Sequence, residues 1–361
     1  MKVMYVCTTG GSGRRQLGGA ERILTQLIPA IAERGVDVVA CVSDDDVASS
    51  LRRSGVAWIN MGARSRVDMG YVREIGSAVD SFAPDVVCTH LLSAAMHSRA
   101  ALGLSRRKTQ LVVTLHNSLW QTRDAASSLP QKAAIQSNIA IDGLLRRLRP
   151  HATVAVSRFE ATELAARGWV ENVHTIPNSL PPAWGSAARA AEPDLPTRVG
   201  YLGRHEWEKG IDFLPEVAAL LPDIRFKVAG RGSMSPAPGP NIDVVGQVDA
   251  AEFLRQVDCL VVPSRVESFG LSALEAISMG VPVVHSGVGG LAEVTEAADG
   301  VLAFRAQLDP AAMASAIRLA TSTAPAGRRL AVADRYAKEY TFTAFVERWH
   351  NLYRTLTHAA H

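Results

Sequence analysis

Two glutamates in the second half of the chain, Glu267 and Glu275, have the residue type and spacing of a ligand-binding pair. An apolar run typical of a buried strand ends at Pro263, a loop then carries Glu267, and a helix is expected to begin near Phe269-Gly270. Glu275 therefore lies about one and a half turns into that helix, near its N-terminal end. One carboxylate in the loop and one on the helix can hold different hydroxyl groups of one ligand. In the alternative interpretation, Glu267 caps the helix and Glu275 is a surface residue.

The beginning of this expected helix also suits an anion. The main-chain N–H groups of Phe269, Gly270 and Leu271 would be unpaired donors in the first turn, at the positive end of the helix dipole. A phosphate group binds well at such a position. The segment therefore predicts a ligand that carries both phosphate and hydroxyl groups.

The glutamate pair and its surroundings resemble the signature of the family 4 retaining glycosyltransferases, which have the GT-B fold. The resemblance continues over nearly the whole chain and is most specific between Glu267 and Gly290. The other segments that match the family pattern are Gly18–Glu21, Thr114–Asn117, Ile176–Ser179, Gly203–Gly210, Val228–Gly232, Leu274–Val284 and Gly289–Val294. One departure is Asn117, since the family often has Asp after the preceding histidine.

The resemblance assigns a role to each polar residue of these segments. It implies that Arg204 and Lys209 bind the donor diphosphate, that Glu267 binds a hydroxyl of the donor sugar, and that Glu275 binds the ribose. A guanidinium fork and a point charge can offset the charge that develops on a leaving diphosphate. His116 is expected to contact the donor sugar. The expected donor-binding residues are Gly18, Gly19, Gly230, Arg231, Val248, Ser268, Phe269, Gly270, Leu271 and Glu275.

Each of these residues also has an ordinary interpretation. Arg204 and Lys209 could be surface charges, Gly18-Gly19 a flexible loop, and His116 a turn residue bonded to the backbone. No metal site is expected, because the acidic run 44–46 is interpreted as a solvated turn after a strand and the basic pair supplies the positive charge. Metal-independent transfer without a cofactor is therefore predicted.

The elements that must position these residues alternate between short β-rich runs and helix-patterned stretches, which indicates parallel sheets with helices on both faces. We expect two doubly wound, Rossmann-like α/β domains that face each other across a cleft, as in the GT-B fold. The expected ranges are 1–182 for the acceptor-side domain, 183–196 for a linker, 197–341 for the nucleotide-sugar domain, and 342–361 for a helix that packs back on the first domain. The expected strands are Lys2–Cys7, Asp37–Val42, Ala57–Met61, Val86–Thr89, Leu111–Leu115, Ala152–Val156, Val173–Ile176, Arg198–Leu202, Arg225–Ala229, Asp243–Val245, Cys259–Val262, Val281–His285 and Gly300–Ala303.

Composition narrows the class of protein. A chain of 361 residues with 47% apolar residues can form two ordinary cores, and its apolar runs are too short to cross a bilayer. No signal peptide is evident, so a cytoplasmic protein is expected. The four cysteines stand alone and are expected to be buried free thiols.

The net charge of +3 is unevenly distributed. Residues 1–170 contain 21 basic and 14 acidic residues, a net charge of +7, which leaves −4 for the remainder. A solvated surface, an anionic substrate and the inner face of an anionic membrane are all consistent with this excess, whereas no motif supports nucleic acid. The segment Gln131–Arg149 ends in Leu144, Leu145 and Leu148 beside arginines. Either these leucines pack on the sheet, or the helix lies on the membrane.

The expected function is transfer of a sugar from a nucleotide-diphosphate donor to an acceptor hydroxyl, with retention of configuration. The resemblance favours a UDP-sugar such as UDP-glucose or UDP-N-acetylglucosamine. The alternatives are a GDP-mannose-dependent mannosyltransferase, a sugar-nucleotide epimerase, a phosphorylase of the same fold, and a non-catalytic protein that binds sugar nucleotides. The acceptor can be a small molecule, a lipid carrier or a glycan.

Overall fold

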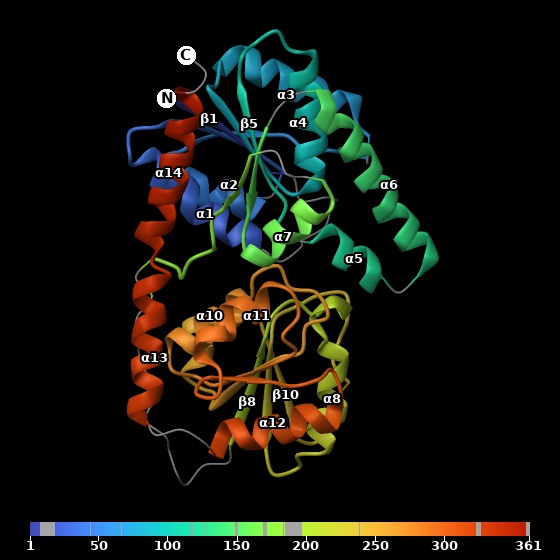
Figure 1. Cartoon of the computed structure of the whole chain (residues 1–361), viewed down its shortest axis with the longest axis vertical. Coiled ribbons are helices and arrows are strands. Elements are labelled where there is room, and N and C mark those ends of the chain that lie inside the picture. The colour runs from blue at the N-terminus through green and yellow to red at the C-terminus, as the bar shows by residue number, and fades with distance from the viewer. Residues whose placement is uncertain are drawn as a thin grey trace. The chain divides into compact units, whose positions relative to one another are not determined.

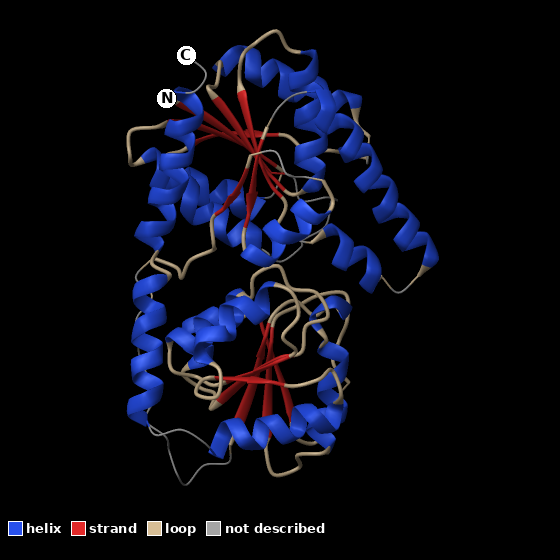
Figure 2. Cartoon of the chain, in the orientation of Figure 1, coloured by secondary structure: helices blue, strands red, loops and turns tan. Residues whose placement is uncertain are grey.

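The computed structural model describes residues 1–7, 19–43, 45–65, 67–116, 118–126, 128–148, 151–168, 172–182, 184, 197–237, 239–322 and 326–358. The chain divides into two compact units: unit 1 comprises Met1–Pro177 with Thr343–His361, and unit 2 comprises Asn178–Phe342. In Figure 2, strands lie at the centre of each unit with helices around them. Gly18, Asn117 and nearly all of the expected linker 183–196 lie outside the described residues.

The described residues of unit 1 form one parallel sheet of seven strands, in the order β3-β2-β1-β4-β5-β6-β7. Figure 1 labels two of these strands, β1 and β5, among the helices of the unit. Its central strands are nearly continuous apolar runs, as expected for parallel strands covered on both faces. The strands are β1 (Lys2–Cys7), β2 (Asp37–Val42), β3 (Ala57–Asn60), β4 (Val86–His90), β5 (Gln110–Thr114), β6 (Ala152–Ala155) and β7 (Val173–Thr175).

The helices of unit 1 include the last helix of the chain, α14, whose apolar face returns to this unit. Its predicted face, which contains Phe345 and Trp349, is buried, and the Tyr353 hydroxyl donates a hydrogen bond to the Tyr5 hydroxyl at 2.9 Å. The helices are α1 (Gly19–Ala32), α2 (Asp45–Arg53), α3 (Met69–Phe82), α4 (Leu92–Leu104), α5 (Leu119–Ala125), α6 (Leu129–Leu145), α7 (Arg158–Ala166) and α14 (Phe342–His358), and a 3-10 turn follows α6 (Arg146–Leu148).

Unit 2 has a parallel sheet of six strands in its described residues, in the order β10-β9-β8-β11-β12-β13. The strands are β8 (Arg198–Leu202), β9 (Arg225–Ala229), β10 (Ile242–Gly246), β11 (Cys259–Val262), β12 (Val283–His285) and β13 (Ala303–Arg305). The helices are α8 (Leu214–Ala219), α9 (Ala250–Leu254), α10 (Leu271–Ser278), α11 (Gly290–Thr295), α12 (Pro310–Ser322) and α13 (Ala326–Glu339), with 3-10 turns at Trp207–Lys209, Ile211–Phe213 and Glu296–Ala298.

The two parallel sheets confirm the predicted fold class, and most strands lie where the sequence predicts them. One position is wrong: the last strand is Ala303–Arg305, whereas Gly300–Ala303 was expected. Gly300 has a φ of +65° and its N–H donates to the carbonyl of Ala303, so the chain turns there before it can pair. All four cysteines are buried and free, as predicted. None of the helices in the described ranges has the length and apolar character required to cross a membrane.

Candidate active site

The order of strands in unit 2 reverses between β8 and β11, which are neighbours in the sheet. In doubly wound sheets, ligands bind outside the carboxyl ends of the strands at such a reversal. The loop after β8 carries Arg204 and Lys209, and the loop after β11 carries Glu267. Arg204, Lys209 and Glu267 therefore lie on the two loops where this fold class binds its ligands.

Arg265 ties these two loops together. Its guanidinium forms a bidentate ion pair with Asp212, with N···O distances of 2.7 and 2.6 Å, and donates to the carbonyl of Trp207 at 2.6 Å. The guanidinium also lies over the Trp207 ring, 4.2 Å from its centre. Gly210, on the loop after β8, has a φ of +70°. A Cβ at this position would lie 1.9 Å from the carbonyl oxygen of Pro263, which begins the loop after β11. The position of Lys209 is thus fixed by close packing of one loop on the other.

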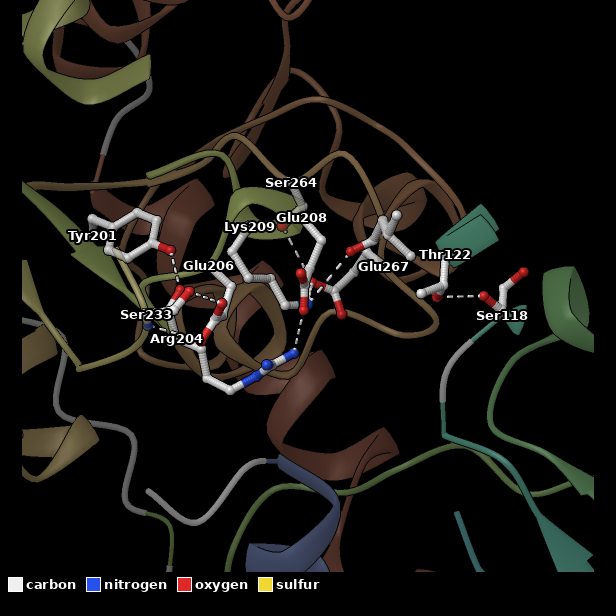
Figure 3. A network of polar contacts seen from close by, with 11 residues as sticks. Ser118, Thr122, Tyr201, Arg204, Glu206, Glu208, Lys209, Ser233, Ser264 and Glu267 are labelled. Carbon is white, nitrogen blue, oxygen red and sulfur yellow. Dashed lines mark hydrogen bonds and ion pairs between the residues drawn. The ribbon is translucent and has the colours of Figure 1, made fainter. Parts of the chain in front are cut away.

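Lys209 and Glu267 form an ion pair across the two loops (Figure 3). The Lys209 Nζ atom lies 2.8 Å from Glu267 Oε2 and 3.4 Å from the carbonyl oxygen of Val266. The Ser264 hydroxyl donates to the same carboxylate oxygen at 3.3 Å. Both charged side chains are mostly buried, 21% and 15% exposed, so neither is an ordinary surface charge.

The Arg204 side chain is held by Glu208, four residues later in the same loop. Its guanidinium donates to Glu208 Oε1 at 2.7 Å, and the Tyr201 hydroxyl donates to the Arg204 carbonyl at 2.7 Å (Figure 3). Burial raises the pKa of the Tyr201 phenol, which keeps it protonated as a donor. The Arg204 side chain is 38% exposed, so it is positioned by Glu208 and still accessible to a ligand.

The helix after Glu267 begins two residues later than the sequence indicated. Helix α10 starts at Leu271, and Gly270 is its N-cap with a φ of +105°, so Phe269 and Gly270 precede the first turn. The N-cap Gly270 has no side chain, and the hydrogen bonds of the Glu267 carboxylate go to Lys209 and Ser264, which argues against the capping interpretation of Glu267. Glu275 is only 3% exposed, which rules out the surface interpretation.

The glycine pair after β12 allows the loop of Glu267 to approach helix α11. The Gly290 N–H donates to the Glu267 carbonyl at 2.9 Å. A Cβ at Gly290 would lie 2.0 Å from the Ser268 carbonyl oxygen, so only glycine fits there. Ser268 and Phe269 are buried behind this contact.

The predicted nucleotide turn is brought together from three strand ends. The Gly230 N–H donates to the Gly246 carbonyl at 2.7 Å, which joins the ends of β9 and β10. A Cβ at Gly230 would lie 1.8 Å from the Gly203 carbonyl oxygen, at the end of β8. Arg231 and Val248 are exposed beside this junction. Gly230 is therefore required by close backbone packing.

In unit 1, His116 follows β5 and is half-buried with a left-handed φ of +60°. Its Nε2 atom lies 2.7 Å from Nδ1 of His90, which is fully buried at the end of β4. Burial lowers the pKa of His116 to about 4. His116 thus bonds to the side chain of His90, whereas the alternative interpretation expected a turn residue bonded to the backbone.

Gly19 is the exposed first residue of α1.

Ser118, which begins the next helix, is fixed by two contacts. Its side chain caps α5 by accepting from the Gln121 N–H, and its hydroxyl donates to Glu163 on α7. The Thr122 hydroxyl donates to the Ser118 carbonyl at 2.7 Å (Figure 3). The turn after His116 is therefore attached to the rest of unit 1.

The sequence analysis missed three residues that contact predicted site residues or the loops that carry them. Arg265 lies within the motif around Glu267, but its partner Asp212 is distant in sequence. Glu208 lies within the basic segment and His90 directly follows the predicted strand Val86–Thr89, yet nothing in their spacing reveals their contacts. In the part of the chain that the structure describes, no cluster of His, Cys, Asp and Glu could hold a metal ion.

Two family models match the chain and together cover most of it. The model described as Glycosyltransferase Family 4 matches residues 17–184, and the model described as Glycosyl transferases group 1 matches residues 196–322. Among curated relatives, a glycogen synthase of Mycobacterium tuberculosis is 34% identical over 194 residues, which are 49% of this chain and 46% of that protein. A D-inositol 3-phosphate glycosyltransferase of Streptomyces avermitilis is 31% identical over 277 residues, 66% of this chain and 58% of that protein. The chain thus spans about half the length of these relatives.

Solved structures share the fold over the full chain. HepE of Anabaena in complex with UDP and glucose has a TM-score of 0.78 at 17% identity, covering 98% of this chain and 99% of that one. A sucrose-phosphate synthase of Thermosynechococcus elongatus has a TM-score of 0.77 at 20% identity, covering 99% and 100%. At these identities the likeness concerns the fold.

Proposed function

Because the chain belongs to glycosyltransferase family 4, we propose that it transfers a sugar from a nucleoside-diphosphate donor to an acceptor hydroxyl with retention of the anomeric configuration. The observation that carries this proposal is the placement of Arg204, Lys209 and Glu267 on the two loops at the strand-order reversal of unit 2. Two cations and a carboxylate at that position suit a ligand with a diphosphate and a sugar.

The cations stabilise the leaving group. As the bond between sugar and phosphate breaks, negative charge develops on the diphosphate, and Arg204 and Lys209 offset it. The Lys209 ammonium has three N–H donors, and its contacts with Glu267 and the Val266 carbonyl account for two. Lys209 can therefore bind a phosphate oxygen while it keeps Glu267 in place. Because these residues supply the positive charge, we propose transfer without a metal ion or other cofactor.

The carboxylates orient the donor. We assign Glu267 to a hydroxyl of the donor sugar, Glu275 to the ribose, and His116 to a further sugar contact, as the family pattern implies. A phosphate oxygen of the donor assists deprotonation of the acceptor on the same face, so no general base of the protein is assigned.

A UDP-sugar, such as UDP-glucose or UDP-N-acetylglucosamine, is the proposed donor. The support is the usage of the family and the UDP bound by the structurally similar HepE. The base is assigned to the junction of Gly230, Arg231 and Val248, where backbone groups can bind its edge. Titration calorimetry with UDP, GDP and ADP tests this assignment. The tightest binding is expected for UDP, whereas tightest binding of GDP would favour GDP-mannose instead.

Retention is tested by incubating the protein with an α-linked UDP-sugar and candidate acceptors, and assigning the product anomer by NMR. An α-linked product is expected. A β-linked product would refute the retaining mechanism, and release of nucleotide independent of any acceptor would indicate a different reaction.

A further inference from the structure

His90 and His116 meet at the carboxyl ends of two neighbouring strands of unit 1, β4 and β5. The N···N distance is 2.7 Å, and the rings stack with centres 5.0 Å apart and an interplanar angle of 25°. The His90 ring is enclosed by Tyr5, whose ring centre lies 6.1 Å away, and by Trp349 of α14 at 5.8 Å. The His90 ring thus has a fixed orientation, and the Nε2 atom of His116 is used by its hydrogen bond to His90.

The backbone is strained where the chain leaves β4 and where it leaves β5. Leu91 has a φ of +74° and His116 a φ of +60°, a region that non-glycine residues rarely adopt because the Cβ atom crowds the backbone. The Leu91 N–H donates to the Thr114 carbonyl at 3.0 Å and so connects the two exits. The fold holds both residues in unfavourable conformations at the point where the imidazoles meet.

Both imidazoles are neutral near pH 7. Burial lowers the pKa of His90 well below its usual range and that of His116 to about 4. A neutral imidazole has one N–H donor and one acceptor nitrogen, so in this pair one ring donates and the other accepts. Which ring donates depends on what the remaining nitrogen of His90 contacts.

That nitrogen contacts a thiol. The Sγ atom of Cys88 lies 3.4 Å from Nε2 of His90. Burial raises the pKa of Cys88 to about 12, so the sulfur carries its proton. The thiol has a second neighbour, the Tyr353 hydroxyl, whose own proton goes to Tyr5. A thiol sulfur is a weak acceptor, whereas the lone pair of an imidazole nitrogen is a better acceptor than a phenol oxygen, so we take the S–H to donate to Nε2 of His90. His90 then carries its proton on Nδ1 and donates it to Nε2 of His116.

We propose that His90, oriented by Cys88, is a positioning residue that holds His116 in its Nδ1–H tautomer, so that His116 offers a hydrogen-bond donor to the ligand. Among the described residues, the Nδ1 atom of His116 has no hydrogen-bond partner. The identity of the accepting group, a hydroxyl oxygen of the donor sugar, rests on the proposed function. The tautomer itself does not.

The tautomer is measured directly by long-range ¹H–¹⁵N NMR of protein labelled with [¹⁵N]histidine, without any ligand. The His116 signals are assigned from their loss in His116→Gln. We expect the Nδ1–H pattern in the wild type and in His90→Asn, whose amide can still donate. His90→Phe keeps a ring against Tyr5 but has no nitrogen, and is expected to shift His116 to a mixture or to Nε2–H. An Nε2–H pattern in the wild type, or an unchanged pattern in a folded His90→Phe variant, would overturn the proposal.

Kinetics provide the second measurement. His90→Phe is expected to lower kcat/KM for the donor about tenfold, as loss of one oriented hydrogen bond does, whereas His90→Asn stays within about threefold. Equal kcat/KM for wild type and His90→Phe would overturn the ligand-facing role. If the NMR pattern is as expected but no nucleotide sugar is turned over, the proposed function fails while the tautomer assignment stands.

Discussion

Lys209 and Glu267 are 58 positions apart in the sequence, yet the ammonium of one lies 2.8 Å from the carboxylate of the other. The contact exists because β8 and β11 are adjacent in the sheet and the loops after them pack through Arg265 and Gly210. A cation and a carboxylate that stabilise each other in this way are both oriented before a donor binds.

We predict that Arg204→Ala and Lys209→Ala each lower turnover by about two to three powers of ten, because each removes a donor to the leaving diphosphate. Initial rates with saturating donor and acceptor measure the effect. The matched control is Arg318→Ala, which removes an exposed unit 2 arginine paired with Asp223 and should change the rate less than about twofold. Wild-type rates in both folded variants would refute the diphosphate assignment. Addition of EDTA is expected to leave wild-type activity unchanged.

The close approach at Gly210 gives a prediction for stability and activity together. Gly210 and Gly300 both have left-handed φ values, +70° and +65°, but a Cβ at Gly300 has nothing within 4 Å. Gly300→Ala therefore bears only backbone strain, about 1 to 2 kcal/mol. Gly210→Ala adds a clash with the Pro263 carbonyl, so it should destabilise unit 2 more and displace Lys209. Urea unfolding and initial rates test this, and equal effects of the two substitutions would contradict it.

Much of the fold could be predicted because buried parallel strands are short apolar runs between helical patterns. The motif around Glu267 and Glu275 also predicted the correct loop and helix. The strand at Gly300–Ala303 could not be placed, because a turn that contains buried Val301 and Leu302 has the same apolar pattern as a strand. Contacts such as Arg265 with Asp212 depend on which strands are neighbours, which spacing along one chain does not encode.

A buried carboxyl in unit 1 predicts an unusual pH dependence. Glu160 is 2% exposed, and burial, reinforced by Glu163, raises its pKa to about 7. The folded protein therefore binds this proton more tightly than the unfolded chain. The contribution is fully present below about pH 4.5 and is lost as pH rises towards 7, by up to about 1.4 kcal/mol per pH unit.

Glu160→Gln keeps an oxygen to accept from the Val156 N–H and cannot ionise. We expect this variant to gain stability relative to the wild type as pH rises from 5 to 8. Urea unfolding followed by circular dichroism at both pH values measures the difference. A constant stability difference between the two proteins would show that the Glu160 pKa is not raised.

The exposed end of helix α6 has residue types that could bind an anionic membrane. Only Ile139 and Asp142 of this helix are buried, and Leu144 is 66% exposed, so it does not pack on the sheet. Arg147, exposed one turn further on, can interact with lipid phosphates while Leu144 enters the interface. The side chain of Leu148 and the whole of Arg149 lie outside the described residues.

We predict flotation with anionic vesicles at low salt, less flotation at physiological salt, and none with neutral vesicles, because each basic residue near the surface contributes about 1 kcal/mol that salt screens. Leu144→Ser should reduce flotation at low salt. Leu319→Ser, which changes an exposed leucine of unit 2, is the control and should have no effect. Absence of the wild type from the floating fraction at low salt would exclude an electrostatic membrane site and favour an acceptor in solution. Equal loss in both variants would show that the contact is not specific to α6.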